Sequence, residues 1–237
     1  QRMLTHTFCH VPGVGTGTEK ALWAAGLTDW RAVLGSAALP LTPAKAARMR
    51  SRMDESLTRL AARDVRHFAA SLPPKEHWRL YPEFRKSLVY LDIETTGLGY
   101  GDHMTTVVLY DGTAVQHFVY GRNLSDLGDS LAQYDLLVSY NGKSFDLPFI
   151  RRSLGIPLDQ PHIDLRHVLA GLGFRGGLKG CERQLGLHRG DLTEVDGYFA
   201  VLLWQAYRRH RDPRILETLL AYNTLDVLNL EQLMVRE

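Results

Sequence analysis

An apolar run that leads directly into two carboxylates is the feature that most restricts how this chain can fold. Residues 88–91 are typical of a buried strand, and Asp92 and Glu94 follow it. Alternate side chains of a strand point to one face, so both carboxylates should lie on the same face. They repel each other unless a proton or a cation compensates their charge, and oxygen-only ligands favour Mg²⁺ or Mn²⁺. The simpler alternative is a solvated strand end.

A tight turn is expected immediately after this pair. The segment Thr95, Thr96, Gly97 and Leu98 combines two hydroxyls with a glycine, and its backbone N–H groups are suited to a phosphate or to the end of a nucleotide chain. We therefore treat these four residues as candidate substrate contacts.

A second acidic segment follows another apolar strand, at the start of the next expected helix. Asn141 and Gly142 predict a turn whose backbone can approach a ligand closely, and Asp146 stands just beyond it. Phe145 is placed to stack on a base, Asn141 to fix the loop or touch the substrate, and Lys143 to contact a backbone phosphate. The structural alternative is that Asp146 begins a helix favoured by the helix dipole, with Phe145 in the core and Lys143 solvated.

A third segment contributes a phenol and a carboxylate to one helix. Tyr222 and Asp226 are four residues apart, so they share a helix face. A phenol one turn before an acidic metal ligand is placed to orient a water molecule beside the metal. The alternative is an ordinary amphipathic helix with Tyr222 half-buried and Asp226 solvated.

The rest of the chain predicts two regions of different character. Residues 1–72 should form a small helical N-terminal region. Adjacent prolines at 73 and 74 predict an extended linker over 73–86, and 87–237 should form an α/β domain with a mixed sheet covered by helices. Helices are expected at 18–25, 30–34, 43–70, 124–133, 143–154, 164–171, 177–186, 197–210 and 213–235, and strands at 87–93, 105–110, 114–120 and 136–139.

Composition permits a nucleic-acid partner without requiring one. The net charge is +2 with a pI of about 8.6, so a local basic stripe matters more than the total. Cys9 and Cys181 are too few and too far apart for a disulfide framework or a cysteine-rich zinc site. A reducing cytoplasm is the simplest expected setting, and we find no signal peptide and no apolar run long enough to span a bilayer.

Together, the three segments resemble the three motifs of the DEDD superfamily of 3′–5′ exonucleases, which have a ribonuclease-H-like fold. Asp-x-Glu is matched by Asp92 and Glu94, and the second motif by Asn141, Phe145 and Asp146. Tyr222 and Asp226 match the tyrosine (DEDDy) form of the third motif. The histidine form would place His where Ala221 stands. The sequences of residues 139–148, 162–165 and 222–228 are typical of the YprB-like branch of this fold. The resemblance to the ribonuclease-H-like proteins covers residues 87–236.

This resemblance implies a mixed β-sheet flanked by helices and a site for two divalent metal ions, Mg²⁺ or Mn²⁺. Asp92, Glu94, Asp146 and Asp226 would hold the ions, and Tyr222 would position the attacking water. The implied reaction is hydrolysis at a single-stranded DNA or RNA 3′ end, DNA being favoured, to nucleoside 5′-monophosphates. Two alternatives stay open, a nucleic-acid-binding module on a decayed nuclease fold and a structure-selective endonuclease on the same fold.

Several other residues are weaker candidates for nucleic-acid contacts. The segment 11–22 resembles the Pro-Gly-x-Gly hairpin of helix-hairpin-helix modules, although a glycine-rich turn before a helix capped at Thr16 or Thr18 is the alternative. Asp164 is expected to cap a helix and His162 to be packed or exposed. Further phosphate contacts are conceivable at Lys179 and Arg183 and at two arginine clusters, Arg48, Arg50 and Arg52 and Arg208, Arg209, Arg211 and Arg214.

Overall fold

The computed structural model describes residues 3–189 and 197–235, which fall into two compact units on either side of the Lys86–Ser87 junction. Every regular element that the structure describes in the first unit is a helix. They are η1 (Leu4–His6), α1 (Thr16–Ala24), α2 (Trp30–Gly35), α3 (Pro43–Ala61), α4 (Val65–Ser71), η2 (Pro74–Leu80) and α5 (Tyr81–Phe84). Its core includes Trp30 stacked on Phe68, with ring centroids 5.9 Å apart.

Two expectations for the first unit are wrong in detail. The single helix expected over 43–70 is two helices, because Arg63 adopts a left-handed conformation (φ 54°) and Asp64 then caps α4 by accepting from the N–H of His67. The extended linker expected over 73–86 is mostly helical. Pro74 begins η2, where the fixed φ of proline suits a first helical turn, so the proline pair starts a helix instead of preventing one.

The start of α1 also differs from the capping that we considered. Gly15, and not Thr16 or Thr18, is the N-cap residue, and no side chain caps the helix. Glu19 in the first turn is buried, where it accepts from the backbone N–H of Phe8 at 2.6 Å and pairs with Arg79 at 2.8 Å. Glu19 therefore stabilises the interior of the first unit.

The second unit is built on a mixed sheet, as expected, which has five strands. Its strands are β1 (Leu88–Thr95), β2 (Met104–Tyr110), β3 (Val115–Val119), β4 (Leu136–Ser139) and β5 (His162–Asp164), in the order β3-β2-β1-β4-β5. Strand β1 pairs antiparallel with β2 and parallel with β4, so it lies at the centre. The sequence did not predict β5, because three residues are too few to show a periodicity.

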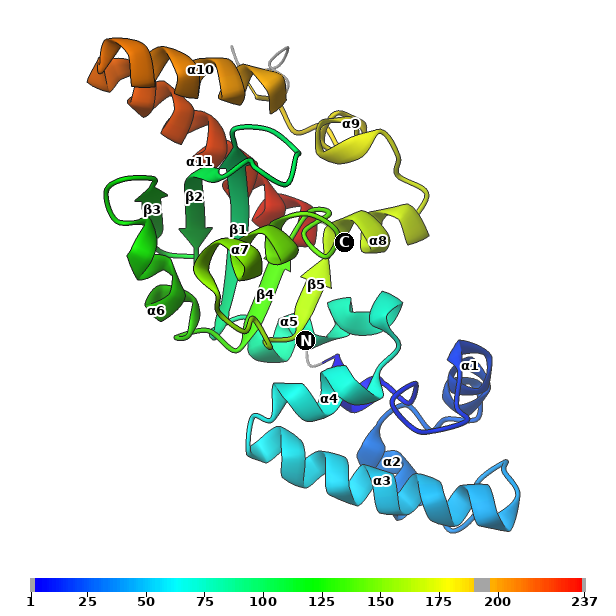
Figure 1. Cartoon of the computed structure of the whole chain (residues 1–237). Coiled ribbons are helices and arrows are strands. Elements are labelled where there is room, and N and C mark those ends of the chain that lie inside the picture. The colour runs from blue at the N-terminus through cyan, green and yellow to red at the C-terminus, as the bar shows by residue number, and fades with distance from the viewer. Residues whose placement is uncertain (1–2, 190–196, 236–237) are drawn as a thin grey trace. The chain divides into compact units, whose positions relative to one another are not determined.

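Helices cover both faces of this sheet (Figure 1). Those of the second unit are η3 (Leu124–Asp126), α6 (Leu127–Leu131), α7 (Asp146–Leu154), α8 (Leu165–Gly171), α9 (Gly177–Gln184), α10 (Gly197–His210) and α11 (Pro213–Val235). The odd-numbered residues of β1, from Val89 to Ile93, pack in one core with α6 and α7. Helix α11 packs across β1 and β2. None of the described helices is both long and apolar enough to cross a membrane.

Candidate metal-binding active site

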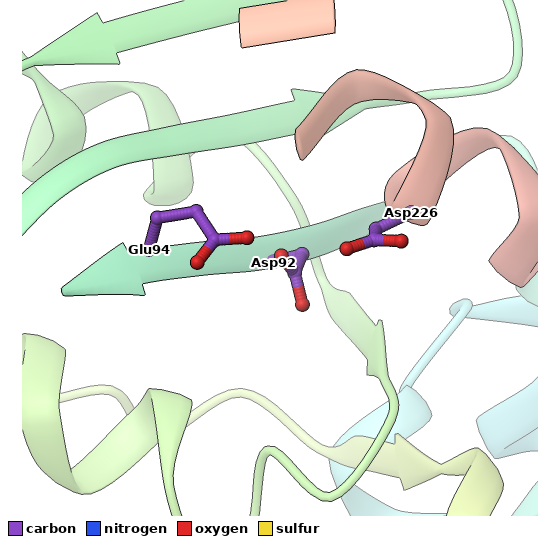
Figure 2. A group of neighbouring side chains, drawn as sticks. All are labelled: Asp92, Glu94 and Asp226. Carbon is purple, nitrogen blue, oxygen red and sulfur yellow. The ribbon is translucent and has the colours of Figure 1, made fainter. Parts of the chain in front are cut away.

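Three carboxylates from two elements converge at the centre of the second unit. Asp92 and Glu94 lie on one face of β1, as the period of a strand requires, and Asp226 reaches them from α11 (Figure 2). One oxygen of each of the three carboxylates lies within 4.8 Å of the others. Sequence neighbours and a residue more than 130 positions away thus form one acidic cluster, because α11 covers the central strand.

Asp146 lies against the same strand, close enough to Asp92 and Glu94 to interact with their charges. It is the first residue of α7 and is only 2% exposed, and its Oδ1 accepts a hydrogen bond from the backbone N–H of Ile93 at 3.2 Å. The helix begins three residues later than expected, since the turn before it extends over residues 142–145. The structure therefore brings all four predicted carboxylates together.

The four carboxylates hold protons unusually tightly. Burial raises the pKa of Asp92 and Glu94 well above the ordinary range, and repulsion from Asp226 and Asp146 raises it further. Burial also raises the pKa of Asp146 to about 7 and that of Asp226 to about 6. Such a cluster of negative charge is relieved by protons or by a cation.

The donor set fits a hard divalent cation. Every ligand atom of the cluster is a carboxylate oxygen, which is the preference of Mg²⁺ and Mn²⁺. Asn223 orients one of these ligands, because its Nδ2 donates to Asp92 Oδ2 at 2.6 Å while its Oδ1 accepts from Thr106 Oγ1 at 3.0 Å. Oriented ligands of this kind are typical of metal sites. The sequence placed Asn223 inside the third motif but assigned it no role.

A buried arginine that sequence reasoning missed also contacts the cluster. Arg189 lies 2.5 Å from Asp226 Oδ1, and it donates from Nε and Nη2 to the two oxygens of Glu182, which also accepts from Asn229. Burial alone would lower the pKa of Arg189, but Glu182 and Asp226 raise it above its ordinary value, so it stays charged. No spacing rule links residue 189 to residue 226, so the sequence offered no signal for this contact.

Tyr222 lies beside the carboxylates with a lysine on its hydroxyl. It is 2% exposed, and Lys179 Nζ donates to its OH at 2.9 Å while lying 5.0 Å from its ring centroid. Burial and the nearby acids raise the pKa of Tyr222 above its ordinary value, so the phenol stays protonated. Lys179, considered as a phosphate contact, is therefore engaged with Tyr222, whereas Arg183 is exposed on α9.

The turn at Asn141 is held mainly by Asp164. Asn141 has φ 64°, and the backbone N–H groups of Asn141 and Lys143 both donate to the carboxylate of Asp164, which also caps α8 as predicted. Gly142 is required because a Cβ there would clash with Ser139 Oγ. The sequence indicated that the backbone of this turn approaches a ligand closely. In the structure the close approach is between Gly142 and Ser139 of the protein itself.

His162 and Arg166 complete this turn from the edge strand and the helix after it. The Ser139 hydroxyl is hydrogen-bonded to His162 Nε2 at 2.8 Å, so His162 is packed as expected. Arg166 donates to Asn141 Oδ1 at 2.6 Å. The turn that precedes Asp146 is therefore tied to β4, β5 and α8.

The remaining candidate substrate contacts differ in whether their side chains are engaged within the protein or exposed to solvent. The hydroxyl of Thr95 donates to the Gly97 carbonyl and that of Thr96 to Asp102, so both stabilise the turn after β1. Leu98 is 85% exposed. Phe145 is half-buried against the core beside Phe149, and Lys143 is exposed. Substrate contact by these residues stays a prediction.

Comparisons with known proteins agree with this architecture. A family model described as the RNase_H superfamily matches residues 89–236. The uncharacterized protein YprB of Bacillus subtilis (strain 168) is 30% identical over 174 residues, which cover 64% of this chain and 42% of that protein. The chain thus spans less than half the length of this curated relative.

A solved structure is similar in fold to the same part of the chain. The family B DNA polymerase from the hyperthermophilic archaeon Pyrobaculum calidifontis superposes with a TM-score of 0.51 at 19% identity, covering 63% of this chain and 24% of the polymerase. At this level of identity the similarity concerns the fold alone.

Proposed function

The chain belongs to the RNase_H superfamily, on its YprB-like branch, and from this premise we propose that it is a metal-dependent 3′–5′ exonuclease of the DEDDy type. The observation that carries the proposal is the convergence of Asp92, Glu94 and Asp226 within 4.8 Å, with Asp146 and Tyr222 beside them. Each of these residues was a weak candidate by itself. Their meeting in one place is what a shared chemical role requires.

The residues of the cluster divide the work between ligation and orientation. Asp92, Glu94 and Asp226 would hold the divalent cations, with Asp146 supporting them. When bound, two such ions compensate the charge of a phosphodiester and lower the pKa of water. Asn223 fixes the carboxylate of Asp92. Tyr222 stays protonated and therefore orients the water through its hydroxyl instead of removing its proton.

The proposed substrate is the 3′ end of a single strand, DNA in preference to RNA, as the resemblance of the three motifs implies. Water attacks the terminal phosphorus, and the bond from that phosphorus to the 3′ oxygen of the preceding nucleotide breaks. The products are a nucleoside 5′-monophosphate and a strand one nucleotide shorter that ends in a 3′ hydroxyl. We also propose a reducing, cytoplasmic setting, since Cys9 and Cys181 are both free thiols.

The test is degradation of 5′-labelled and 3′-labelled single-stranded oligonucleotides with Mg²⁺ or Mn²⁺. We expect mononucleotides from the 3′ end, and a loss of rate on the order of a thousandfold in Asp92→Ala and Asp226→Ala. Asp129→Ala, which removes an exposed carboxylate on α6, is the matched control and should keep full activity. Full activity in Asp92→Ala and Asp226→Ala would show that the assigned site is wrong.

Two further experiments separate the alternatives. A closed circular single strand has no end, so its cleavage would favour the structure-selective endonuclease over the exonuclease. Calorimetric titration with Mn²⁺ tests the decayed nuclease, because a binding module without catalysis needs no metal. Absence of binding at millimolar Mn²⁺ would favour that module.

A further inference from the structure

Helix α10 and the turn after β1 enclose an open groove next to the carboxylate cluster. The groove has a volume of about 470 Å³ and is lined by Thr96, Val201, Trp204, Gln205, Arg208 and Arg209. It begins two residues beyond Glu94, and α10 packs against β1. Thr96 therefore links the groove to the strand that carries Asp92 and Glu94.

The structure sorts the C-terminal arginine cluster into two groups. Arg214 pairs with Asp212 at 2.8 Å, and the guanidinium of Arg211 lies 5.9 Å from the ring centroid of Tyr207. Arg208 and Arg209 are exposed, line the groove and form no ion pair with any residue that the structure describes. Among the described residues the groove has these two cationic side chains and no acidic one, which makes it complementary to an anion.

Two further residues of α10 line the groove, Trp204 and Gln205. Trp204 is 3% exposed, and its indole N–H has no hydrogen-bond partner among the described residues. This N–H is itself shielded from solvent, so Trp204 contributes an aromatic wall to the groove and not an accessible donor. Gln205, which is exposed on the same helix, adds an amide that can donate or accept.

We propose that this groove binds the sugar–phosphate backbone of the single strand just upstream of the nucleotide that is removed. The proposal rests on the proposed function and adds the path of the strand, from the carboxylates past Thr96 and along α10. Arg208 and Arg209 each contact a phosphate, and recognition is independent of base sequence because phosphates are identical at every position.

The first experiment measures binding without metal, so that no strand is cut. Fluorescence anisotropy of a labelled single strand of about twelve nucleotides, a length that one single-strand site can occupy, is followed in EDTA. We expect Arg208→Ala/Arg209→Ala to bind about tenfold or more weakly. The slope of log affinity against log salt should fall by about 1.4 for two lost phosphate contacts.

The matched control removes the same charge outside the groove. Arg211→Gly/Arg214→Ala serves this purpose, because glycine tolerates the left-handed conformation of residue 211 (φ 56°). This control should bind within about twofold of the wild type. Gln205→Glu places a negative charge in the groove without touching either arginine, and it should weaken binding. Equal losses of affinity in the two double variants, or unchanged binding in Gln205→Glu, would contradict the proposal that this groove binds the strand.

A second experiment uses substrate length in the presence of Mn²⁺. In the wild type, kcat/KM should rise as the strand lengthens from a dinucleotide. In Arg208→Ala/Arg209→Ala this rise should disappear, because KM for the longer strands increases while kcat at saturation is unchanged. A retained length dependence in this variant would contradict the proposal. If the wild type cuts no nucleic acid, the proposed function fails, whereas the binding measurement in EDTA still decides whether the groove holds a strand.

Discussion

Asn223 donates a hydrogen bond to the carboxylate of Asp92 at 2.6 Å, which joins helix α11 to the central strand inside the acidic cluster. Because Asn223 also accepts from Thr106 on β2, both ends of its buried amide are satisfied. Helix α11 therefore supplies both a carboxylate of the cluster, Asp226, and the residue that orients another, three positions earlier. The geometry of the acidic cluster therefore depends on how this helix packs on the sheet.

Replacing this orienting residue should weaken metal binding before it unfolds the protein. In Asn223→Ala the Asp92 carboxylate loses its donor, and we expect Mn²⁺ affinity measured by calorimetry to fall about 10- to 100-fold. The free energy of unfolding should fall by about 1–3 kcal/mol. Thr106→Val removes only the donor that holds Asn223 and should show a smaller loss in the same direction. Unchanged Mn²⁺ affinity in Asn223→Ala would show that Asn223 has no orienting role.

The Lys179–Tyr222 contact should make the two residues act as a unit. Lys179 Nζ donates to the Tyr222 hydroxyl at 2.9 Å, so Tyr222→Phe removes the atom through which Lys179 acts. Lys179 also compensates the charges of Glu94 and Asp226, so we expect Lys179→Met to lower kcat/KM less in the Tyr222→Phe background than in the wild type, with a coupling of about 0.5–3 kcal/mol. Additive losses in the double variant would mean that Lys179 acts elsewhere.

The metal-free protein should become less stable as the pH rises. The folded pKa is raised from 3.8 to about 7 for Asp146 and to about 6 for Asp226, so the fold binds protons more tightly than the unfolded chain. Their contribution to stability is fully present below about pH 4 and is lost as the pH rises through about 6 to 7, at roughly 1.4 kcal/mol per unit of pKa shift. In EDTA the melting temperature should therefore fall from about pH 5 to about pH 8.

The stabilisation of the protein by added Mn²⁺ should increase as the pH rises. Metal ligands must be deprotonated, so the rise in melting temperature on adding Mn²⁺ should grow over the same pH range. Asp146→Asn should flatten the fall measured in EDTA, whereas Asp129→Asn, at an exposed position, should leave it unchanged. A melting temperature in EDTA that rises from acid to neutral pH would contradict the role of these carboxylates.

Removing only one charge of the buried Arg189–Glu182 pair should destabilise the protein more than removing both. Arg189→Met removes the cation that pairs with both Glu182 and Asp226 and leaves Glu182 charged and buried, and we expect a loss of about 3–5 kcal/mol in urea unfolding. Arg189→Met/Glu182→Gln removes both charges, and it should recover most of this loss because the new amide oxygen can still accept from Asn229. Arg183→Met, at an exposed arginine of α9, is the control and should change little. A double variant as unstable as Arg189→Met would show that the charge of Glu182 is not the cause.

The sequence predicted most of the second unit because its signals are local. The apolar run before Asp92 predicted the central strand, and the 3.6-residue period predicted α10 and α11 with the observed bounds, 197–210 and 213–235. Strand β5 was missed because it is short. The break at Arg63 was missed because nothing in the local pattern requires a left-handed residue there.

The sequence by itself determined the chemical types of the candidate site, four carboxylates and a phenol. Its spacing also placed Asp92 with Glu94 on one strand face and Tyr222 with Asp226 on one helix face. Only the tertiary structure decided which partners these groups have. Asn223 on Asp92, Lys179 on Tyr222 and Arg189 on Asp226 are contacts between residues far apart in the chain. Periodicity reports which face of its own element a side chain occupies, whereas the neighbour across that face depends on how separate elements pack.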